Sequence, residues 1–308
     1  MRNIYAIGET LYDIIFQKNQ PKASKPGGAM LNTAVSLGRL QLPVNLISEY
    51  SDDPVGKIIE AFLKENHIQT DHIYKYQKGQ TAIALAFLDK DNNASYTFYK
   101  SYPPERLNIR IPEFQKDDIV LFGSFFALNS EVREKLLGLL RKAREQGAII
   151  LYDPNFRSPH QDELFSLKLV ILQNMSIADI VRGSDEDFMN IFRVDNAEQA
   201  YEAIRQYCPT LIYTASNHFV TIQSPTVTAK FEVPEISTIS TIGAGDNFNA
   251  GVIYGLYKKN VKKADLDNLT IDDWKNIQER AVSFSANVCQ SYDNYISKEF
   301  ANRIMSEL

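Results

Sequence analysis

The residues with the clearest chemical potential stand in the run Gly243–Asp246, which reads Gly-Ala-Gly-Asp. Its glycines let the backbone turn tightly and come close to a ligand. An amphipathic helix is predicted directly after the run, with Phe248 and Val252 on its apolar face. A tight turn that opens a helix presents N–H groups and the positive end of the helix dipole, which suits an anion such as phosphate.

Asp246 stands in the same turn as this predicted anion site. A carboxylate repels phosphate, so its presence makes chemical sense if it accepts a proton from an attacking hydroxyl while the N–H groups hold the developing charge. A cap on the following helix is the alternative role. The turn therefore predicts either a base for a transfer reaction or a helix cap.

A second glycine pair, Gly27 and Gly28, precedes the predicted helix Ala29–Leu40. Glycines let a small ligand touch the backbone, and the amide of Asn32 can donate and accept hydrogen bonds one turn into the helix. A plain entry from loop to helix is the alternative. Asp13 follows the first predicted strand, near the strand ends where ligands of open α/β sheets bind. Its carboxylate could hold two hydroxyls, or it could be a solvated loop acid.

Charged side chains follow two further predicted strands. Arg157 comes after the strand Ile149–Tyr152, and its guanidinium could bind a phosphate through paired hydrogen bonds. The acidic run Ser184–Asp187 follows a strand that ends near Arg182. Its carboxylates could reach Mg²⁺ through water, because Mg²⁺ keeps several of its waters, or they could stabilise the start of the next helix.

Short apolar runs alternate with longer helical patterns along the chain, which indicates an α/β fold with a mainly parallel sheet. The strand runs are apolar throughout, as expected for strands covered by helices on both faces. The predicted strands are Ile4–Ile7, Val44–Glu49, Ile119–Gly123, Ile149–Tyr152, Asp179–Arg182 and Leu211–Thr214. The predicted helices include Ala29–Leu40, a helix that begins at Pro54 with Asp53 as its N-cap, Glu131–Glu145, Trp274–Cys289 and Phe300–Leu308.

Two regions do not fit this alternation. The segment Thr10–Phe16 reads as a strand where a helix was due, and the strands Thr81–Leu88 and Ala94–Lys100 flank a turn signal. These pieces predict either a small separate β-layer that could act as a lid, or a simple hairpin at the edge of the main sheet.

The composition is ordinary for a globular protein: 308 residues, 44% hydrophobic and 23% charged, with a net charge of −5. A general polyanion binder carries a strong basic excess, so nucleic acid and anionic membranes are not expected partners. No apolar run is long enough to span a bilayer and no secretion signal is visible, so we expect a cytoplasmic protein. Cys208 and Cys289 are expected to be reduced core thiols. The P-loop motif is absent, as is a G-x-G-x-x-G after the first strand.

Taken in order, these motifs resemble the ribokinase/PfkB-type family of carbohydrate kinases, from Gly8 to about Ser291. Gly27–Asn32 resembles the family's first signature and Thr241–Asp246 its second. The resemblance implies a ribokinase-like three-layer α/β/α sandwich with a mainly parallel central sheet. It also implies a single kinase domain over residues 1–308, with a small β-sheet lid at roughly residues 10–24 and 80–105 through which a homodimer could form.

Closer features resemble the fructokinase-like branch of this family. They are Gly8-Glu9 with Asp13, Thr97–Lys100, Phe122–Ser124, Asp153–Arg157 and Ser184–Asp187. The implied reaction is transfer of the γ-phosphate of ATP to a hydroxyl of a small sugar, with fructose as the first expectation and Mg²⁺ as the companion of ATP.

The resemblance also implies roles for single residues. Asp246 would be the base, and the N–H groups of Gly243, Ala244 and Gly245 would stabilise the transferring phosphoryl group. The sugar would be bound by Asp13, Gly27, Gly28, Asn32, Phe98 and Arg157. The nucleotide would be bound by Ser184, Asp187, Thr214, Ser216 and Asn287. No direct protein ligand of Mg²⁺ is assigned, and contact through water is expected near Asp187.

The sequence departs from the family pattern at several positions. Ser240 stands where the second signature usually begins with Asp, and the later loop Gln290–Asn294 lacks the usual Gly-Ala. Both positions belong to the family's site for a monovalent cation, so potassium activation is not carried over. Ser216 and Phe219 replace glycines beside the nucleotide, and Pro104–Glu105 replaces Ala-Asp on the lid.

These departures leave two alternatives open. A different acceptor within the family, such as 2-keto-3-deoxygluconate, would need a cation for its acid group, which Lys100 or Arg106 could supply. The other alternative is a sugar-binding protein with weakened catalysis, which Ser216, Phe219 and Ser240 motivate.

Overall fold

The computed structural model describes residues 2–89, 94–156 and 158–307. The chain divides into two compact units. The first unit comprises Met1–Asn3, Glu113–Glu235 and Val252–Val282, and the second comprises Ile4–Pro112, Ile236–Gly251 and Ser283–Leu308. Arg157 and most of the predicted lid turn, residues 90–93, lie outside the described residues. The single domain over residues 1–308 stays a prediction.

Parallel strands and helices build one part of the second unit. Strands β1 (Ile4–Ile7), β4 (Val44–Ser51) and β5 (Ile73–Tyr76) pair in parallel in the order β1-β4-β5. The helices of this unit include α1 (Ala29–Arg39), α2 (Pro54–Glu65) and α9 (Lys298–Ser306). Helix α2 starts as predicted, because the Asp53 carboxylate accepts a hydrogen bond from the Gly56 N–H at 2.7 Å and Pro54 takes the first turn.

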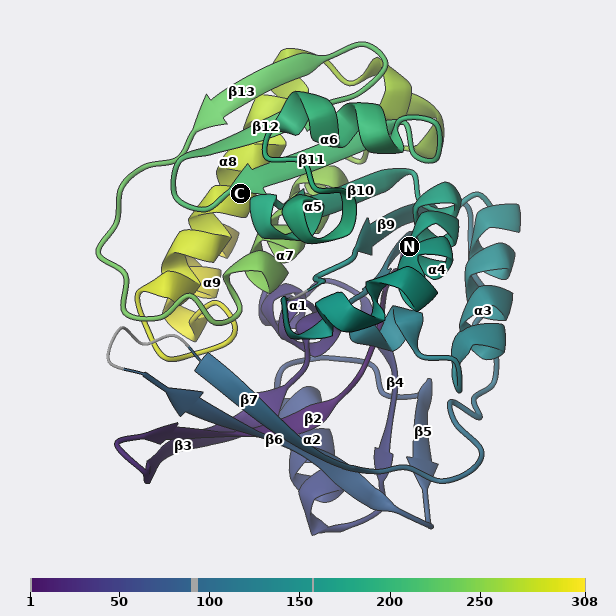
Figure 1. Ribbon diagram of the computed structural model, residues 1–308, viewed down its shortest axis with the longest axis vertical. Helices are drawn as coiled ribbons and strands as arrows, with labels where there is room; N and C mark the ends of the chain where they lie inside the picture. The colour runs from purple at the N-terminus through teal and green to yellow at the C-terminus, as the bar shows by residue number, and fades with distance from the viewer. Residues whose placement is uncertain (1, 90–93, 157, 308) are drawn as a thin grey trace. The chain divides into compact units, whose positions relative to one another are not determined.

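The segments that did not fit the alternation form a separate sheet in the second unit (Figure 1). Its strands are β2 (Leu11–Gln17), β3 (Gln20–Gly27), β6 (Gln80–Leu88) and β7 (Ala94–Ser101), in the order β3-β2-β6-β7. Strands β2 and β6 are parallel, whereas the β2–β3 and β6–β7 pairs are antiparallel. Leu11, Ala82 and Ala84 form a buried cluster with Tyr102 packed against it. The action of this sheet as a lid stays a prediction.

The first unit continues the α/β pattern (Figure 1). Its strands follow the order β13-β12-β11-β10-β9-β8, in which β8 to β11 are parallel and β12 and β13 are added antiparallel. The strands are β8 (Ile119–Gly123), β9 (Ile149–Asp153), β10 (Ile180–Ser184), β11 (Thr210–Ala215), β12 (Phe219–Gln223) and β13 (Thr228–Glu232). The helices are α3 (Arg133–Glu145), α4 (Leu164–Ile177), α5 (Asp185–Phe192) and α6 (Ala197–Ile204).

Two further helices follow the glycine-rich turn. Helix α7 (Ala244–Lys258) begins inside that turn, as the sequence predicts, and α8 (Ile271–Cys289) carries the fully buried Trp274. The mainly parallel strands with intervening helices confirm the predicted α/β class. Among the helices of the described residues, not one combines the length and the apolar character needed to cross a bilayer.

Candidate functional site

The glycine-rich turn of the second unit is locked by close packing. Gly243 has a φ of 78°, in the left-handed region that favours glycine. A Cβ at this position would lie 2.7 Å from the carbonyl oxygen of Asn294, so no larger residue fits without displacing that loop. The Ala244 N–H donates to the Thr241 carbonyl at 3.2 Å as α7 begins. The turn thus opens a helix in a fixed geometry, which suits an anion.

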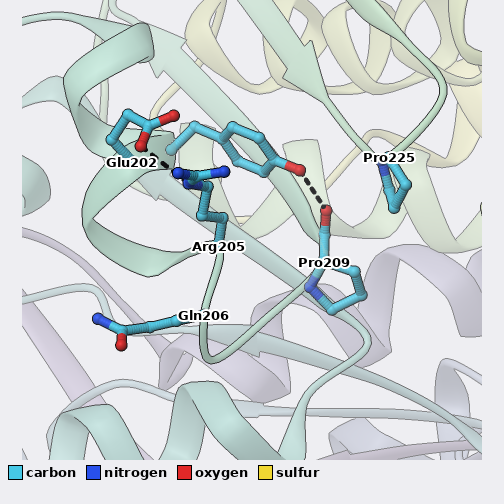
Figure 2. A pocket seen from close by; sticks show the side chains of 6 residues that line it. Glu202, Arg205, Gln206, Pro209 and Pro225 are labelled. Carbon is cyan, nitrogen blue, oxygen red and sulfur yellow. Dashed lines mark hydrogen bonds and ion pairs between the residues drawn. The ribbon is translucent and has the colours of Figure 1, made fainter.

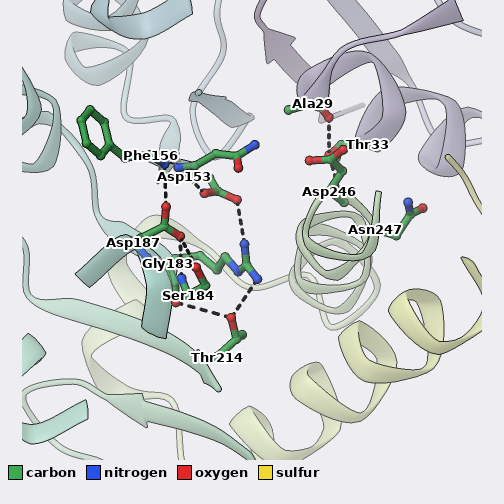
Figure 3. Close-up of polar contacts among 12 residues, drawn as sticks. Ala29, Thr33, Asp153, Phe156, Gly183, Ser184, Asp187, Thr214, Asp246 and Asn247 are labelled. Carbon is green, nitrogen blue, oxygen red and sulfur yellow. Dashed lines mark hydrogen bonds and ion pairs between the residues drawn. The ribbon is translucent and has the colours of Figure 1, made fainter. Parts of the chain in front are cut away.

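Asp246 lies in the first turn of α7 and is held from α1. The Asn32 side-chain amide donates to Asp246 Oδ2 at 2.8 Å. The Thr33 hydroxyl donates to the Asp246 carbonyl at 2.7 Å (Figure 3). Asp246 is half-buried. The neutral amide of Asn32 therefore helps to orient the Asp246 carboxylate.

The second glycine pair clears space for Asp13. A Cβ on Gly27 would lie 2.0 Å from Asp13 Oδ2, so the carboxylate occupies the volume that any side chain at position 27 would need. Gly28 has a φ of 121°, and a Cβ there would lie 2.2 Å from the Glu9 carbonyl oxygen. The glycines predicted for ligand approach therefore also place a carboxylate of the protein.

Asp13 is a buried acid on β2, with an exposed fraction of 8%. The Asn294 amide donates to Asp13 Oδ2 at 3.1 Å. Burial raises the pKa of Asp13 from its ordinary 3.8 to about 7, while Lys25 and the Asn294 amide oppose the shift and Asp246 adds to it. Asp13 therefore changes charge near neutral pH.

The loop at 290–296 contributes a residue that the sequence reasoning did not assign to the site. The side-chain amide of Asn294 donates to Asp13. The main-chain carbonyl of Asn294 accepts a hydrogen bond from Asn247 Nδ2 at 2.8 Å. The two partners Asp13 and Asn294 are 281 residues apart, so no local pattern could reveal the contact. Family resemblance pointed to this loop only through the Gly-Ala that it lacks.

Lys25 places a positive charge on the same loop. Its ammonium donates to the Tyr292 carbonyl and to Asp293 Oδ1, the latter at 3.0 Å, and the residue is 8% exposed. Ser240, at the other departure from the family's cation site, accepts the Ile242 N–H with its hydroxyl at 3.2 Å. Both departures therefore make contacts within the protein.

The cations predicted as alternative anchors for an acidic sugar are both paired. Lys100 on β7 lies 2.8 Å from Glu9, whose other contact is the Tyr102 hydroxyl. Arg106 donates to Glu49 at 2.6 Å, and both residues of this pair are buried. Each cation thus already has an acid of the protein as its partner.

Phe98, predicted to contact the sugar, lies on β7 of the small sheet. Its ring stacks on Tyr96 with a centroid distance of 5.8 Å and an interplanar angle of 9°, and the Lys100 ammonium lies 4.9 Å from the ring centroid. Phe98 and Tyr96 are both exposed. Contact of Phe98 with a ligand stays a prediction.

A buried cluster at the carboxyl ends of the parallel strands marks the first unit. Asp153 ends β9 and pairs with Arg182 of β10 at 3.1 Å, and Arg182 donates to the Thr214 hydroxyl of β11 at 2.8 Å (Figure 3). Thr214, predicted beside the nucleotide, is therefore engaged with a guanidinium. Arg157, predicted to bind phosphate, is not among the described residues.

Ser184 and Asp187 form a capping box at the start of α5. The Asp187 carboxylate accepts hydrogen bonds from the Ser184 N–H at 2.7 Å and from the Phe156 N–H at 2.6 Å (Figure 3). This geometry favours the helix-stabilising interpretation of the acidic run over the interpretation as a magnesium site.

The remaining predicted nucleotide residues lie in a turn and on a helix. Ser216, in the turn from β11 to β12, has a φ of 45°, a conformation that favours the glycine found there in the family. Asn287 on α8 accepts the Ser297 N–H with Oδ1 at 2.9 Å. Among the described residues, no cluster of three His, Cys, Asp or Glu side chains is arranged to hold a metal.

A surface hollow of about 540 Å³ lies elsewhere in the first unit (Figure 2). Within it Arg205 pairs with Glu202 at 2.8 Å, and the Tyr201 hydroxyl donates to the Pro209 carbonyl at 3.1 Å. The lining residues are Tyr201, Glu202, Arg205, Gln206, Pro209 and Pro225. They include none of the residues predicted to bind sugar or nucleotide.

Comparison with known proteins places the sequence among kinases. A fructokinase of Vibrio alginolyticus is 23% identical over 283 residues, which cover 90% of this chain and 87% of that relative. An aminoimidazole riboside kinase of Salmonella typhimurium is 23% identical over 264 residues, which cover 84% of this chain and 82% of that relative.

Solved structures share the fold. A fructokinase of Vibrio cholerae with fructose, ADP and calcium bound superposes with a TM-score of 0.84 at 21% identity, covering 99% of both chains. This likeness confirms the predicted ribokinase-like fold class. Residues 1–296 match the pfkB family of carbohydrate kinases. This protein is therefore a carbohydrate kinase that belongs to the pfkB family.

Proposed function

We propose that the protein transfers the γ-phosphate of ATP to a hydroxyl of a small neutral sugar, with fructose as the first candidate. The observation that carries this proposal is the Asp246 carboxylate, which the Asn32 amide orients at 2.8 Å in the first turn of a helix opened by Gly243. A base and an anion-binding helix end on one turn are what an attacking alcohol and a migrating phosphoryl group require.

In the proposed reaction Asp246 accepts the proton of the sugar hydroxyl. Asn32 holds the carboxylate so that proton transfer needs no reorientation of the side chain. The N–H groups at the start of α7 stabilise the charge that develops on the transferring phosphoryl group. The candidates for this role are the N–H groups of Gly243 and Gly245, on either side of Ala244. Asp13, Gly28 and Asn32 orient the sugar.

ATP and a divalent cation are proposed as the companions of this chemistry. The rigid glycine turn at the start of α7 fits a phosphate, and relatives from Vibrio cholerae and Xylella fastidiosa were solved with ADP or ATP. Mg²⁺ takes few protein carboxylates and keeps several of its waters, so the proposed ion is carried mainly by the phosphates and by water. When bound, the ion neutralises charge between the phosphates.

The charge of the acceptor site supports a neutral sugar. Asp13 and Asp246 are acids, whereas Lys100 and Arg106 are already paired with Glu9 and Glu49. A keto-acid sugar would bring its carboxylate close to Asp13 and Asp246, which repel it. Lys100 and Arg106 already have acids of the protein as partners. The Vibrio cholerae relative, solved with fructose bound, supports fructose in particular.

The alternative of a weakened sugar-binding protein receives less support. Ser216 departs from the family pattern and has a positive φ. It stands far from Asp246 and Asn32 in the sequence. The glycine turn and the oriented Asp246 are both retained. We therefore favour an active enzyme.

We also propose a cytoplasmic homodimer that assembles through the sheet β3-β2-β6-β7. Tyr96, Phe98 and Tyr99 on β7 are large, exposed aromatic side chains of the kind that interfaces bury. Light scattering should give twice the monomer mass, and a monomer at micromolar concentration would contradict the dimer.

The proposed function is tested by ADP release from Mg-ATP across a panel of sugars. The panel contains fructose, other neutral hexoses and pentoses, 2-keto-3-deoxygluconate and aminoimidazole riboside, each with and without potassium. We expect fructose to give the highest kcat/KM and the keto acid to give at least ~10-fold less, because its carboxylate meets acids in the site. Absence of turnover with every neutral sugar would contradict the proposal.

A further inference from the structure

Asn294 is a buried residue of the second unit that lies outside both signature motifs. It is 1% exposed, and its amide nitrogen donates to Asp13 Oδ2 at 3.1 Å. The nitrogen of the amide faces Asp13 and the oxygen faces away from it. This is the orientation that the ionised form of Asp13 requires, because an ionised carboxylate only accepts hydrogen bonds.

The amide oxygen of Asn294 makes no hydrogen bond to any residue that the structure describes. A buried polar atom without a partner costs free energy, so native proteins rarely leave one unless a ligand or another group fills it. Asn32 repeats the arrangement: its nitrogen donates to Asp246, and its buried oxygen has no described partner. Two asparagines thus each hold one acid of the proposed acceptor site and each offer an oxygen.

The loop does not need the Asn294 side chain to stay in place. Its backbone is anchored by the Ile296 N–H, which donates to Ser36 Oγ at 3.1 Å, and by the Ile296 carbonyl, which accepts from Arg39 at 2.6 Å. Lys25 anchors the preceding residues of the loop. The polar end of Asn294 is therefore available for a role other than loop anchoring.

We propose that Asn294 is a positioning and specificity residue for the acceptor sugar, which orients Asp13 with its amide nitrogen and accepts a hydroxyl of the sugar with its amide oxygen. This inference rests on the proposed function. The ligand class is a neutral polyol, because carboxylate and amide oxygens accept hydrogen bonds and sugar hydroxyls donate them. A sugar that lacks the hydroxyl facing Asn294 leaves this oxygen unsatisfied and is bound more weakly.

The test uses Asn294→Leu, which keeps the volume of the side chain and removes both polar groups. Calorimetry with the acceptor sugar should show a Kd at least ~10-fold higher, and KM should rise with it while kcat stays within ~3-fold, because Asp246 and its partner Asn32 are untouched. The pH midpoint of sugar binding should also move upward, because Asp13 loses a donor that favours its charged form while Lys25 and Asp246 still face it.

Asn66→Leu is the matched control. Asn66 is also 1% exposed and lies in the same unit, but it bonds to Arg39 and Phe62. This variant should lose stability and keep both the Kd and the pH midpoint. If Asn294→Leu behaves in the same way, the inference is overturned.

A second measurement needs no variant and covers the case that Asn294→Leu does not fold. The wild-type protein should bind at least one monodeoxy analogue of its sugar ~10-fold more weakly than the sugar itself. Equal binding of all monodeoxy analogues by the wild type would overturn the inference. Where the variant folds, it should no longer distinguish that analogue from the parent sugar.

Failure of the inference can be separated from failure of the proposed function. Without any sugar, carbon-detected NMR of labelled aspartate reports the titration of the Asp13 carboxyl group. If the wild type phosphorylates no sugar, the proposed function fails, but a titration midpoint that moves upward in Asn294→Leu still supports the link to Asp13. An identical midpoint in both proteins overturns the inference whatever the activity.

Discussion

Asp13 and Asp246 in the second unit are held by a different kind of partner from Asp153 and Asp187 in the first unit. In the second unit, asparagine amides donate to Asp246 at 2.8 Å and to Asp13 at 3.1 Å. In the first unit, Asp153 pairs with the Arg182 guanidinium at 3.1 Å, and Asp187 accepts the N–H groups of a helix start. Asp13 lies within β2 and Asp153 ends β9, whereas Asp246 and Asp187 each lie in the first turn of a helix.

The difference teaches which acids remain available for chemistry. A neutral amide orients a carboxylate and leaves its negative charge in place, whereas a guanidinium at hydrogen-bond distance neutralises it. In the proposed function, Asp13 and Asp246 of the second unit are the acids that accept sugar hydroxyls and a proton. In the first unit, Asp153 pairs with Arg182 of the neighbouring strand and Asp187 caps a helix, and mutations should separate these two uses.

The largest effect is expected from Asp246→Asn. It should lower kcat by at least ~10²-fold, because the proton acceptor is lost, while the sugar Kd changes less than ~3-fold. Rapid-quench kinetics and calorimetry measure the two quantities. A near-normal kcat would remove Asp246 from the reaction and with it the contrast between the units.

Arg182→Met should cost stability more than chemistry. The substitution removes the cation beside Asp153, a residue that is 1% exposed, and should lower the free energy of unfolding by about 3–5 kcal/mol. Urea unfolding measures it, and Arg182→Lys, which keeps the charge, should lose less. A cost below ~1 kcal/mol would show that the acids of the first unit are not held by charge pairing.

The pH dependence of Asp13 should show opposite trends in stability and sugar binding. Its pKa of about 7 in the folded protein exceeds the ordinary 3.8, so the folded state binds the extra proton and stability falls as pH rises from 4 to 7. Sugar affinity should rise over the same range, with the Kd about 100-fold higher at pH 5 than at pH 9 if only the ionised form binds.

Thermal unfolding and calorimetry across this pH range measure the two trends, and Asp13→Asn should flatten both. Trends that persist in this variant would assign them to another group. Lys25 and Asp246 are the charged residues that act on Asp13, and they would be the next to substitute.

The smallest effect is expected from Ser184→Ala. It removes the hydroxyl of the capping box and should lower the free energy of unfolding by about 1 kcal/mol. The KM for Mg-ATP should stay within ~2-fold if Ser184 acts only as a cap. A KM at least ~10-fold higher would place Ser184 against the nucleotide and restore the role that family resemblance implies.

Strongly patterned elements were predicted from the sequence. The strands Ile4–Ile7 and Ile119–Gly123 coincide with β1 and β8, and the α2 cap at Asp53 has the predicted contact. Helix α4 was missed because its apolar residues lie on all sides, to the extent that Phe165 is 98% exposed. The β12–β13 pair was missed because short strands of mixed polarity carry little periodic signal.

The glycine turns and Asp246 could be predicted because the required backbone conformations are local and only glycine adopts them readily. The pairing of Asp13 with Asn294 could not, because it joins residues 281 positions apart. Similarly, the sequence left open whether Asp187 caps a helix or approaches a metal. The capping box that Asp187 forms with Ser184 favours the cap, and the N–H of the distant Phe156 occupies the other carboxylate oxygen.

Gly243 lies so close to the Asn294 main-chain carbonyl that substitutions at the two positions are expected to be coupled. In the proposed reaction, position 243 shapes the site of the transferring phosphoryl group, and position 294 selects the acceptor alcohol. A larger residue at position 243 would displace the backbone of residue 294. A change at the phosphoryl site would therefore also alter which acceptor sugar is bound. Lineages that exchange one sugar for another are therefore expected to vary residue 294 freely while position 243 stays glycine.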